Sequence, residues 1–398
     1  MCSISALLAA MSNAPSALRA RGGTATTERA RSAGVTDLRM SGLDWSIFVI
    51  LVKTGYALGK RFFLEVQMQE LKIVIAGAGA ISEFHLKGWQ AQEGVTLAAI
   101  CDPDEGKARA RAEEFGIPAV YTDVAEMLEA TQPDAIDIIT PVASHAPLVE
   151  MAADRGVHVM CQKPLTPTVA EAEALIEKVG ERVRFMVHEN YRFRPHFAEV
   201  AQRVQAGEVG RVRHARMTVR SSSMYDYPGR VPFLLGRQPY MGSFRRLVVF
   251  EVLIHHLDAL RSIFGEMVVE SATLDQINPE LEGEDVALVT LRTRDGALVV
   301  IDANISALGY PPLPTDRLEV LGEADSLVLD REVLRLMSRE EPVTVHDLKA
   351  NYQACFTGAV SAFVTGLREG TPFPTDRLDN LETLRLMEGI YVAAGVAI

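Results

Sequence analysis

The sequence predicts an α/β protein in which a doubly wound, parallel sheet precedes a second α/β domain with an open, mostly antiparallel sheet. Short apolar runs rich in Ile and Val alternate with helical stretches over residues 71–188, and turn residues follow each run. After Gly210 the strands alternate apolar and polar residues and are joined by tight turns. We expect a poorly ordered extension over residues 1–69, the doubly wound domain over 70–192 and the second domain over 193–398.

The N-terminal region differs in composition from the rest of the chain. Residues 1–40 contain five Arg, no Lys and two acidic residues, Glu28 and Asp37, among many Ala, Ser, Thr and Gly. A leader rich in Arg and Ser and poor in acids is typical of an organelle transit peptide. The simpler interpretation, which we favour, is an extension that does not fold, ahead of a domain that begins near Met68.

The composition excludes several classes of partner. The chain carries 52 Asp and Glu against 40 Lys and Arg, a net charge of -12, so we expect no nucleic-acid partner. No run of about 18 apolar residues is present, so we expect no membrane span. The cysteines lie far apart, which indicates a reducing, cytoplasmic location rather than a disulfide framework or a zinc site. They are Cys2, Cys101, Cys161 and Cys355.

The expected elements of the first sheet follow one another at the spacing of strand–helix units. The expected strands cover residues 72–76, 96–102, 119–121, 135–139, 157–161 and 183–188. The expected helices cover residues 81–90, 107–115, 124–129 and 145–155. The carboxyl ends of parallel strands share one edge of such a sheet, and ligands bind there.

A glycine turn joins the first strand to the first helix. Gly77 and Gly79 let the backbone approach a pyrophosphate, and the following helix offers unpaired N–H groups to an anion. Ser82 stands where the dinucleotide fingerprint has its third glycine. Asp102 ends the second strand, where an acid can bond a ribose 2′-hydroxyl, which favours NAD over NADP. The alternative is that Asp102 only caps the next helix.

Polar residues also follow the later strands of this sheet. Thr140 and Lys163 come directly after two of them, so they converge on the same edge as the glycine turn. We expect Lys163 to point into the crevice at that edge rather than into solvent. Asn190 and Arg192 lie in the segment 189–195, whose Asn, Tyr and Arg side chains could bind a polyhydroxylated or anionic ligand; the alternative is a surface turn.

The second domain begins with an alternating strand and ends with two helices. Its expected strands cover residues 211–221, 285–294, 297–306, 318–321 and 326–329, and its expected helices cover residues 250–264, 352–368 and 377–394. Glu251 and His255 are four residues apart, hence on one face of the first of these helices. A histidine held beside acids can accept a proton, but it can equally be a core histidine satisfied by its neighbours. We expect no metal site, because no further ligand set of suitable spacing follows.

Four segments, in this order, resemble the Gfo/Idh/MocA oxidoreductases, the family of glucose–fructose oxidoreductase and inositol dehydrogenase. They are Gly77-x-Gly79-x-Ile81-x-x-x-His85, Thr140-Pro141-x-x-x-His145, Lys163-Pro164 and Glu251-x-x-x-His255-x-x-Asp258. The resemblance covers about residues 70–397 and implies an NAD(P)-binding Rossmann domain. It also implies a C-terminal open sheet that often packs against another subunit, as in a homodimer or homotetramer. The family's usual Glu-Lys-Pro and Asp-x-x-x-His are changed here to Gln162-Lys163-Pro164 and Glu251-x-x-x-His255.

The resemblance implies a dehydrogenase of sugars or polyols with NAD as its cofactor. In catalysis, His255 accepts the hydroxyl proton, Lys163 holds the substrate oxygen, and Glu251 orients the imidazole or relays its proton. The implied cofactor-binding residues are Gly77, Gly79, Ala80, Ile81, Asp102, Thr140, Pro141, His145, Gln162 and Asn190. The implied substrate-binding residues are Lys163, Arg192, Tyr240, His255 and His256, of which His256 is also a rival base.

Two further segments, 188–195 and 238–240, are most similar to the sugar dehydrogenases of this family, in particular the D-apiose dehydrogenase type. That similarity implies oxidation of an aldose at C1 to a lactone. Two alternatives remain beside it: a non-catalytic NAD-binding regulator, and an NAD-dependent glycosidase of similar fold.

Overall fold

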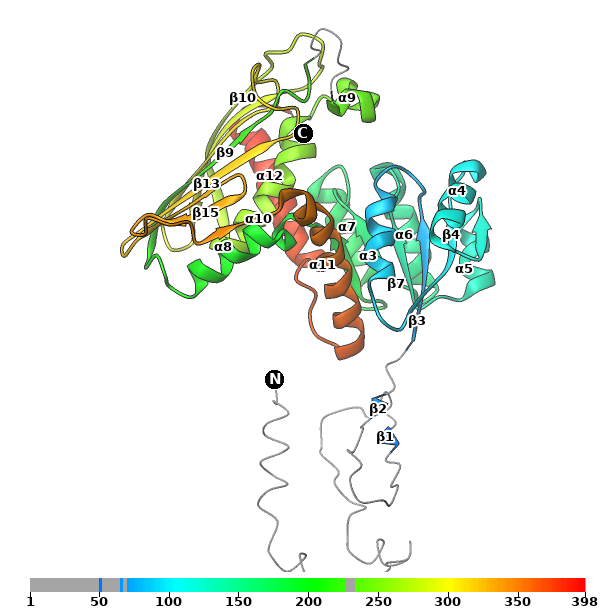
Figure 1. The fold of residues 1–398 in the computed structure, drawn as a ribbon. Coiled ribbons are helices and arrows are strands. Elements are labelled where there is room, and N and C mark those ends of the chain that lie inside the picture. The colour runs from blue at the N-terminus through cyan, green and yellow to red at the C-terminus, as the bar shows by residue number, and fades with distance from the viewer. Residues whose placement is uncertain (1–49, 52–64, 67–69, 226–232, 398) are drawn as a thin grey trace, which may run out of the picture. The chain divides into compact units, whose positions relative to one another are not determined.

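The computed structural model describes residues 50–51, 65–66, 70–225 and 233–397 (Figure 1). By its internal contacts the chain divides into two units, Met1–Met68 and Gln69–Ile398. In the first unit, β1 (Ile50–Leu51) pairs antiparallel with β2 (Glu65–Val66). The remainder of the predicted extension lies outside the described residues.

A six-stranded sheet carries the N-terminal part of the second unit. Its strands run in the order β5-β4-β3-β6-β7-β8, and every neighbouring pair is parallel. They are β3 (Leu71–Ala76), β4 (Val95–Cys101), β5 (Ala119–Tyr121), β6 (Ala135–Ile138), β7 (His158–Gln162) and β8 (Phe185–His188). This is the strand order of a Rossmann fold, with its switch point between β3 and β6. The predicted doubly wound sheet is confirmed.

The helices around this sheet begin where the sequence supplies caps. They are α3 (Ser82–Gln90), α4 (Glu105–Phe115), α5 (Val124–Thr131), α6 (His145–Asp154) and α7 (Val169–Val179). Asp104 accepts the backbone N–H of Lys107 at the start of α4, and Asp123 accepts that of Glu126 at the start of α5. The cap of α4 is therefore Asp104, which leaves Asp102 for another role.

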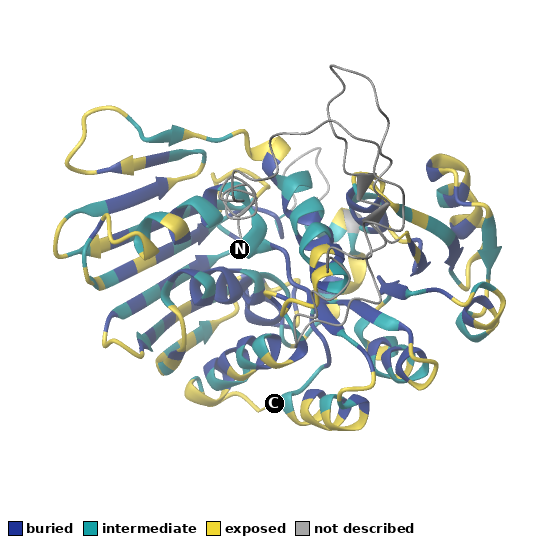
Figure 2. Ribbon diagram, turned by 90° about the horizontal axis from the view of Figure 1, so that it is seen from below, coloured by how far each residue is buried: buried dark blue, intermediate teal, exposed yellow. Residues whose placement is uncertain are grey.

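An eight-stranded sheet carries the C-terminal part. Its order is β10-β11-β12-β9-β13-β14-β15-β16, and every pair is antiparallel except β12 with β9. The strands are β9 (Val212–Arg220), β10 (Met267–Asp275), β11 (Val286–Thr293), β12 (Leu298–Asn304), β13 (Thr315–Gly322), β14 (Ser326–Asp330), β15 (Val333–Leu336) and β16 (Thr344–Val345). Burial alternates along its central strands (Figure 2), so one face is packed and the other is more open.

Helices cover the packed face of this sheet (Figure 1). They are α8 (Pro195–Gln205), α10 (Ile254–Phe264) and α12 (Arg377–Ala393), whereas α11 (Leu348–Glu369) lies beside the parallel sheet. Short helical segments lie in the connections: Val142–Ser144 follows β6, Tyr191–Phe193 follows β8, and α9 (Phe233–Arg237) and Pro239–Ser243 follow β9. Helix α11 returns to the first sheet and packs on α3, where the Phe84 and Phe356 rings stack at 5.1 Å. Among the helices in the described part of the chain, none combines the length and apolar character needed to cross a bilayer.

The segment around Glu251 departs from the predicted single α-helix over 250–264. A π-helical turn covers Val248–Leu253, and the α-helix begins only at Ile254. The wider turn breaks the four-residue register that would place Glu251 and His255 on one face. Glu284 supports this turn, because its Oε1 accepts the backbone N–H groups of Leu247 and Val249 at 3.0 and 3.1 Å.

Candidate active site at the edge of the parallel sheet

The glycine turn after β3 has the geometry that only glycine permits. Gly77 has a φ of +107°, and a Cβ at this position would lie 2.3 Å from the carbonyl oxygen of Ile139. A Cβ on Gly79 would meet nothing within 4 Å, so the space beside this residue is open. Ile81 precedes α3 and forms no side-chain cap, and the backbone N–H groups of Ser82 and Phe84 donate to the carbonyl oxygens of Gly79 and Ile81, both at 3.1 Å. What the helix start offers an anion is therefore the positive end of the helix dipole.

The Asp102 carboxylate is fixed against this turn. Its Oδ2 accepts the backbone N–H of Ala78 at 2.8 Å, and its Oδ1 accepts that of Asp104 at 2.9 Å. Each carboxylate oxygen has a second acceptor position, so Asp102 can still accept a hydrogen bond from a hydroxyl group. The carboxylate therefore stands at the end of β4, beside the glycine turn, where a ribose is expected.

His145 joins two loops at the same edge. Its ring nitrogens lie 2.8 Å from the carbonyl oxygen of Thr140 and 2.9 Å from that of Pro164. The ring is buried, and burial lowers the pKa of His145. His145 thus positions the loop of Thr140 and Pro141 against the loop after β7, with both nitrogens engaged by backbone.

Lys163 reaches from the end of β7 to the π-helical turn. Its Nζ lies 3.2 Å from both the Oε2 and the backbone oxygen of Glu251. The side chains of this pair are 13% and 18% exposed, so each is largely buried but keeps some access to solvent. The expectation that Lys163 points inward agrees with this geometry.

His255 meets a carboxylate that the sequence analysis did not select. Its Nδ1 lies 2.5 Å from Oε1 of Glu189, which also accepts the backbone N–H groups of Asn190 at 2.9 Å and Tyr191 at 3.4 Å. Tyr191 stacks on the imidazole with ring centroids 4.4 Å apart. Burial, followed by the charge of Lys163, lowers the pKa of His255 well below its ordinary value of 6.5. The imidazole is therefore neutral at neutral pH.

Glu189 is wholly buried, and burial raises the pKa of this carboxyl. Its Oε2 has no hydrogen-bond partner among the described residues. The sequence signal for Glu189 was its place directly after β8, on the same edge as Lys163. The carboxylate that contacts the imidazole is that of Glu189, whereas Glu251, which was expected to orient the imidazole or relay its proton, contacts Lys163 and acts on His255 through its charge.

Two predicted substrate residues are engaged elsewhere. His256 is fully buried, with its Nδ1 3.1 Å from the Val252 carbonyl oxygen and its Nε2 3.1 Å from Oδ1 of Asp316. Arg192 donates two hydrogen bonds to the buried Asp258, at 2.7 and 2.5 Å, and others to Asp379 and to a backbone carbonyl. We therefore assign both residues to the framework of the site and remove His256 as a rival base.

Tyr240, Asn190 and Gln162 are further predicted site residues. Tyr240 is 57% exposed, and partial burial of its phenol, followed by the charge of Glu251, raises its pKa. Asn190 is buried, and its Oδ1 has no hydrogen-bond partner among the described residues. Gln162 turns its side chain inward, so its amide nitrogen lies 2.7 Å from Nε2 of His85.

Comparison with known proteins follows the same division of the chain. Residues 71–190 match the Gfo/Idh/MocA oxidoreductase family with an NAD-binding Rossmann fold, and residues 197–328 match the Gfo/Idh/MocA C-terminal domain. The chain is 32% identical to D-apiose dehydrogenase of Paraburkholderia graminis, over 82% of this chain and 88% of that protein. It is 26% identical to myo-inositol 2-dehydrogenase of Thermotoga maritima, over 76% and 90% of the two chains.

The solved structures show the same architecture. An oxidoreductase from Agrobacterium radiobacter, in complex with NAD+, L-tartaric acid and magnesium, is 28% identical and superimposes with a TM-score of 0.75. The match covers 82% of this chain and 97% of that one. The chain belongs to the Gfo/Idh/MocA oxidoreductases. It is an enzyme of this NAD-binding family, as the resemblance in its four motifs implied.

The turn in this Gfo/Idh/MocA chain fits the dinucleotide. Gly77 brings the backbone close to the start of α3, and the open space at Gly79 is what a pyrophosphate requires. The described residues contain no group of three His, Cys, Asp or Glu placed to hold a metal ion.

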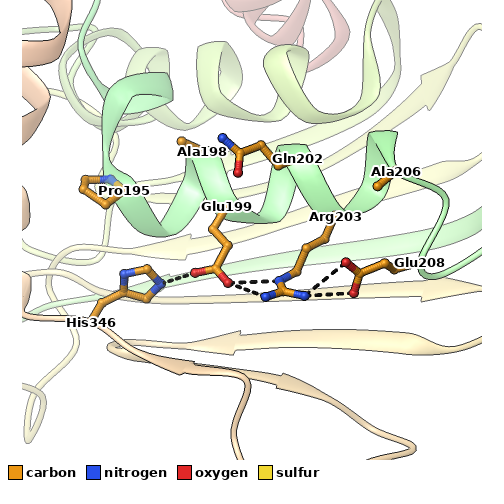
Figure 3. A pocket seen from close by; sticks show the side chains of 8 residues that line it. All are labelled: Pro195, Ala198, Glu199, Gln202, Arg203, Ala206, Glu208 and His346. Atoms are coloured by element: carbon orange, nitrogen blue, oxygen red, sulfur yellow. Dashed lines mark hydrogen bonds and ion pairs between the residues drawn. The ribbon is translucent and has the colours of Figure 1, made fainter.

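A separate hollow of about 570 Å³ lies along α8 (Figure 3). An ionic chain runs through it from His346 to Glu199, Arg203 and Glu208. None of the residues that line the hollow is among the predicted site residues. They are Pro195, Ala198, Glu199, Gln202, Arg203, Ala206, Glu208 and His346.

Replacing the two glycines by alanine separates folding from cofactor binding. Gly77→Ala places a Cβ against a backbone oxygen and strains φ, so we expect the stability to fall by about 1–3 kcal/mol. Gly79→Ala meets no protein atom and should keep the melting temperature, but its methyl group narrows the space for the pyrophosphate. We expect its Kd for NAD to rise at least ~10-fold, a loss of about 1.4 kcal/mol. Thermal unfolding and calorimetric titration measure the two effects, and unchanged NAD affinity in Gly79→Ala would contradict this location.

Proposed function

We propose that the protein oxidises a hydroxyl group of a sugar or polyol to a carbonyl group. NAD, when bound to the Rossmann domain, supplies the hydride acceptor. The observation that carries the proposal is a neutral imidazole, His255, beside a fixed ammonium group, Lys163, at the carboxyl edge of the NAD-binding sheet. A base and a cation at this place are what removal of a hydroxyl proton requires.

His255 is the proposed base. Its Nδ1–H donates to Glu189, which fixes the tautomer that leaves the lone pair on Nε2. The substrate O–H proton passes to this nitrogen while the C–H bond breaks with its electron pair and the C=O bond forms. The buried Glu189 carboxylate then stabilises the imidazolium.

Lys163 is the proposed ligand of the reacting oxygen. Its ammonium donates to the oxygen as negative charge develops there. Glu251 holds the ammonium from the other side through its carboxylate and its backbone oxygen. Tyr240 and Asn190 are the proposed further contacts of the substrate and the cofactor, because the charge of Glu251 acts on the Tyr240 phenol and the buried Oδ1 of Asn190 has no hydrogen-bond partner among the described residues.

The substrate class follows from the relatives. The chain is 32% and 28% identical to the D-apiose dehydrogenases of Paraburkholderia graminis and Rhizobium rhizogenes, over 82% of its length in both cases. This similarity supports oxidation of an aldose such as D-apiose at C1, with a lactone as product. The Asp102 carboxylate beside the glycine turn supports NAD over NADP, because it would repel a 2′-phosphate.

Two alternative functions, a non-catalytic NAD-binding regulator and an NAD-dependent glycosidase, can be compared with this proposal. A non-catalytic NAD-binding regulator would not need the charge-paired Lys163 and the oriented His255. An NAD-dependent glycosidase would release free sugar from a glycoside, whereas a dehydrogenase reduces NAD with the free sugar. A screen of NAD reduction over aldoses, inositols and branched sugars, beside a glycoside cleavage assay, distinguishes them.

We infer that the protein assembles as a homodimer or homotetramer through the open face of the eight-stranded sheet. Val268, Leu288 and Leu321 share this face and are 64%, 50% and 40% exposed. Covering them by a second copy would remove apolar surface from water. We expect light scattering to give two or four copies, and Leu288→Arg to shift the mass toward the monomer; a wild-type monomer contradicts the inference.

A cytoplasmic location is supported by the free, buried thiols of Cys101, Cys161 and Cys355.

Removal of the base or of the cation should abolish most turnover. Lys163→Ala and His255→Ala should each lower kcat by about 10²–10⁴-fold, the contribution of one acid–base group, while NAD still binds. Steady-state kinetics with the best sugar of the screen, and a titration with NAD, give the two readings. Near-normal turnover in either variant would refute the assignment. Lys178→Ala, at an exposed surface ion pair, is the control and should retain wild-type kcat.

Glu189 variants separate charge from orientation. Glu189→Gln can keep an oxygen opposite Nδ1 of His255 but removes the negative charge, so the pKa of His255 falls. The base must be neutral to act, and activity is lost as the pH falls through its pKa; the acid limb of kcat/KM should therefore move to lower pH. Glu189→Leu removes the bond as well and should lower kcat by about 10²–10⁴-fold. A pH profile identical to wild type in Glu189→Gln would contradict the contact.

A further inference from the structure

Gln162 is enclosed by donors and acceptors that fix the orientation of its amide. Its Oε1 accepts the backbone N–H of Lys163 at 3.1 Å. Its Nε2 lies 2.7 Å from Nε2 of His85 and 3.3 Å from Nδ1 of His188. Because a backbone N–H can only donate, the oxygen must face Lys163 and the NH₂ group must face the two imidazoles. Its two hydrogens therefore require a lone pair on each facing ring nitrogen.

The surroundings of His85 agree with this assignment, whereas Nε2 of the buried His188, which would carry the proton of that ring, has no hydrogen-bond partner among the described residues. Nδ1 of His85 lies 2.8 Å from Oδ2 of the buried Asp137, so the proton of His85 sits on Nδ1 and the lone pair on Nε2. Asp137 also accepts the indole N–H of Trp89 at 2.8 Å. The His85 and His188 rings overlap with centroids 3.9 Å apart, an arrangement in which two positive charges would repel each other.

The other elements packed around this cluster bring few ionisable groups. Phe356 of α11 covers both rings, with centroids 5.4 Å from each. Lys163 follows Gln162 on the same strand end, and Glu189 follows His188. A positive charge on His255 of α10 would lower the pKa of His188 in addition to burial. Burial lowers the pKa of His188 well below 6.5, in keeping with a neutral ring.

We propose that Gln162 is a positioning residue that holds the main chain at Lys163 and requires both flanking histidines to be unprotonated where they face it. We call the contacts of Gln162 with Lys163, His85 and His188 the Gln162 clamp. The geometry of this clamp is independent of the proposed reaction, and only its benefit to catalysis rests on the proposed function. Because an amide carries no proton that titrates in this range, the clamp keeps Lys163 in place across the neutral pH range.

An acid at this position would behave differently. One carboxylate oxygen could still accept the N–H of Lys163, but the other would face two imidazole lone pairs. Both hydrogens of the amide are then lost. His188 can supply one of them by carrying its own proton on Nδ1, because its Nε2 has no hydrogen-bond partner among the described residues. His85 cannot, because its Nδ1 proton is held by Asp137, so the contact with His85 is satisfied only when a proton binds to that imidazole or to the carboxylate. An acid at position 162 of this chain would therefore demand a proton that Gln162 does not.

The test is the pH dependence of stability in the full chain without substrate. Gln162→Glu raises the pKa of the cluster above the unfolded value near 6.5, so its stability is retained below that pH and lost as the pH rises through the folded pKa. We expect its melting temperature to be close to that of wild type at pH 5.5 and to fall increasingly behind it up to pH 9. Gln202→Glu, an exposed residue of α8, is the matched control and should stay parallel to wild type.

Kinetics and cofactor titration complete the test. Above pH 7, Gln162→Glu should lower kcat by about 10²-fold, the cost of a ~1 Å displacement of a reacting group, with less change in the Kd for NAD. If this variant does not fold, Gln162→Met, which has similar length and no polar group, should show a kcat loss that does not vary with pH.

Three results would overturn the inference. They are a constant difference in melting temperature across the pH range, a wild-type kcat in Gln162→Met, and a weaker NAD affinity with unchanged pH dependence. The last result would indicate that Gln162 contacts the cofactor, as the family resemblance implied. Failure of the proposed reaction itself would show in Lys163→Ala and His255→Ala, and it would leave the melting temperatures of the Gln162 variants unaffected.

Discussion

The hydrogen bond between Glu189 and His255 is the contact on which the rest of the site depends. It joins the end of β8, in the parallel sheet, to α10, which covers the antiparallel sheet. A buried carboxylate without partners would cost several kcal/mol. Glu189 therefore holds the imidazole and two backbone N–H groups on one oxygen, and this fixes the loop that carries Asn190 and Tyr191. The two halves of the chain are brought into one site by this polar requirement as well as by apolar packing.

At the carboxyl edge of the parallel sheet, some charged side chains face the proposed reaction site, and others only hold the surrounding structure together. Asp258 lies three residues after His255 in the chain, but its carboxylate binds Arg192. His256 binds Asp316 of β13, in the eight-stranded sheet. These pairs satisfy groups that face the interior, whereas Lys163 keeps a partly exposed ammonium at the crevice. The π-helical turn supports this division, since it aims Glu251 at Lys163 and leaves His255 to Glu189. Insertions of this kind are frequent at functional sites because they redirect one side chain without moving the helix.

Much of the parallel half could be predicted, because strand–helix alternation leaves few topologies and right-handed crossovers fix the edge where the strands end. Gly77, Asp102 and Lys163 stand at that edge as expected. The antiparallel half was less predictable: β10 alternates over a largely exposed surface, and its apolar signal is weak. Glu189 was passed over because an acid next to a histidine and an asparagine has no local pattern that distinguishes a buried orienting group from a turn residue.

By itself, the sequence determined the parallel sheet, the glycine turn, the family and the identity of the lysine and histidine that face the crevice. These features are local, since they depend on periodicity, on a residue that must adopt positive φ and on motifs at fixed spacing. Only the tertiary structure decided which carboxylate contacts His255 and which way the amide of Gln162 points. It also decided that Arg192 and His256 bind buried carboxylates. Each of those depends on hydrogen-bond partners from elements far apart in the chain, and burial makes the satisfied arrangement the stable one.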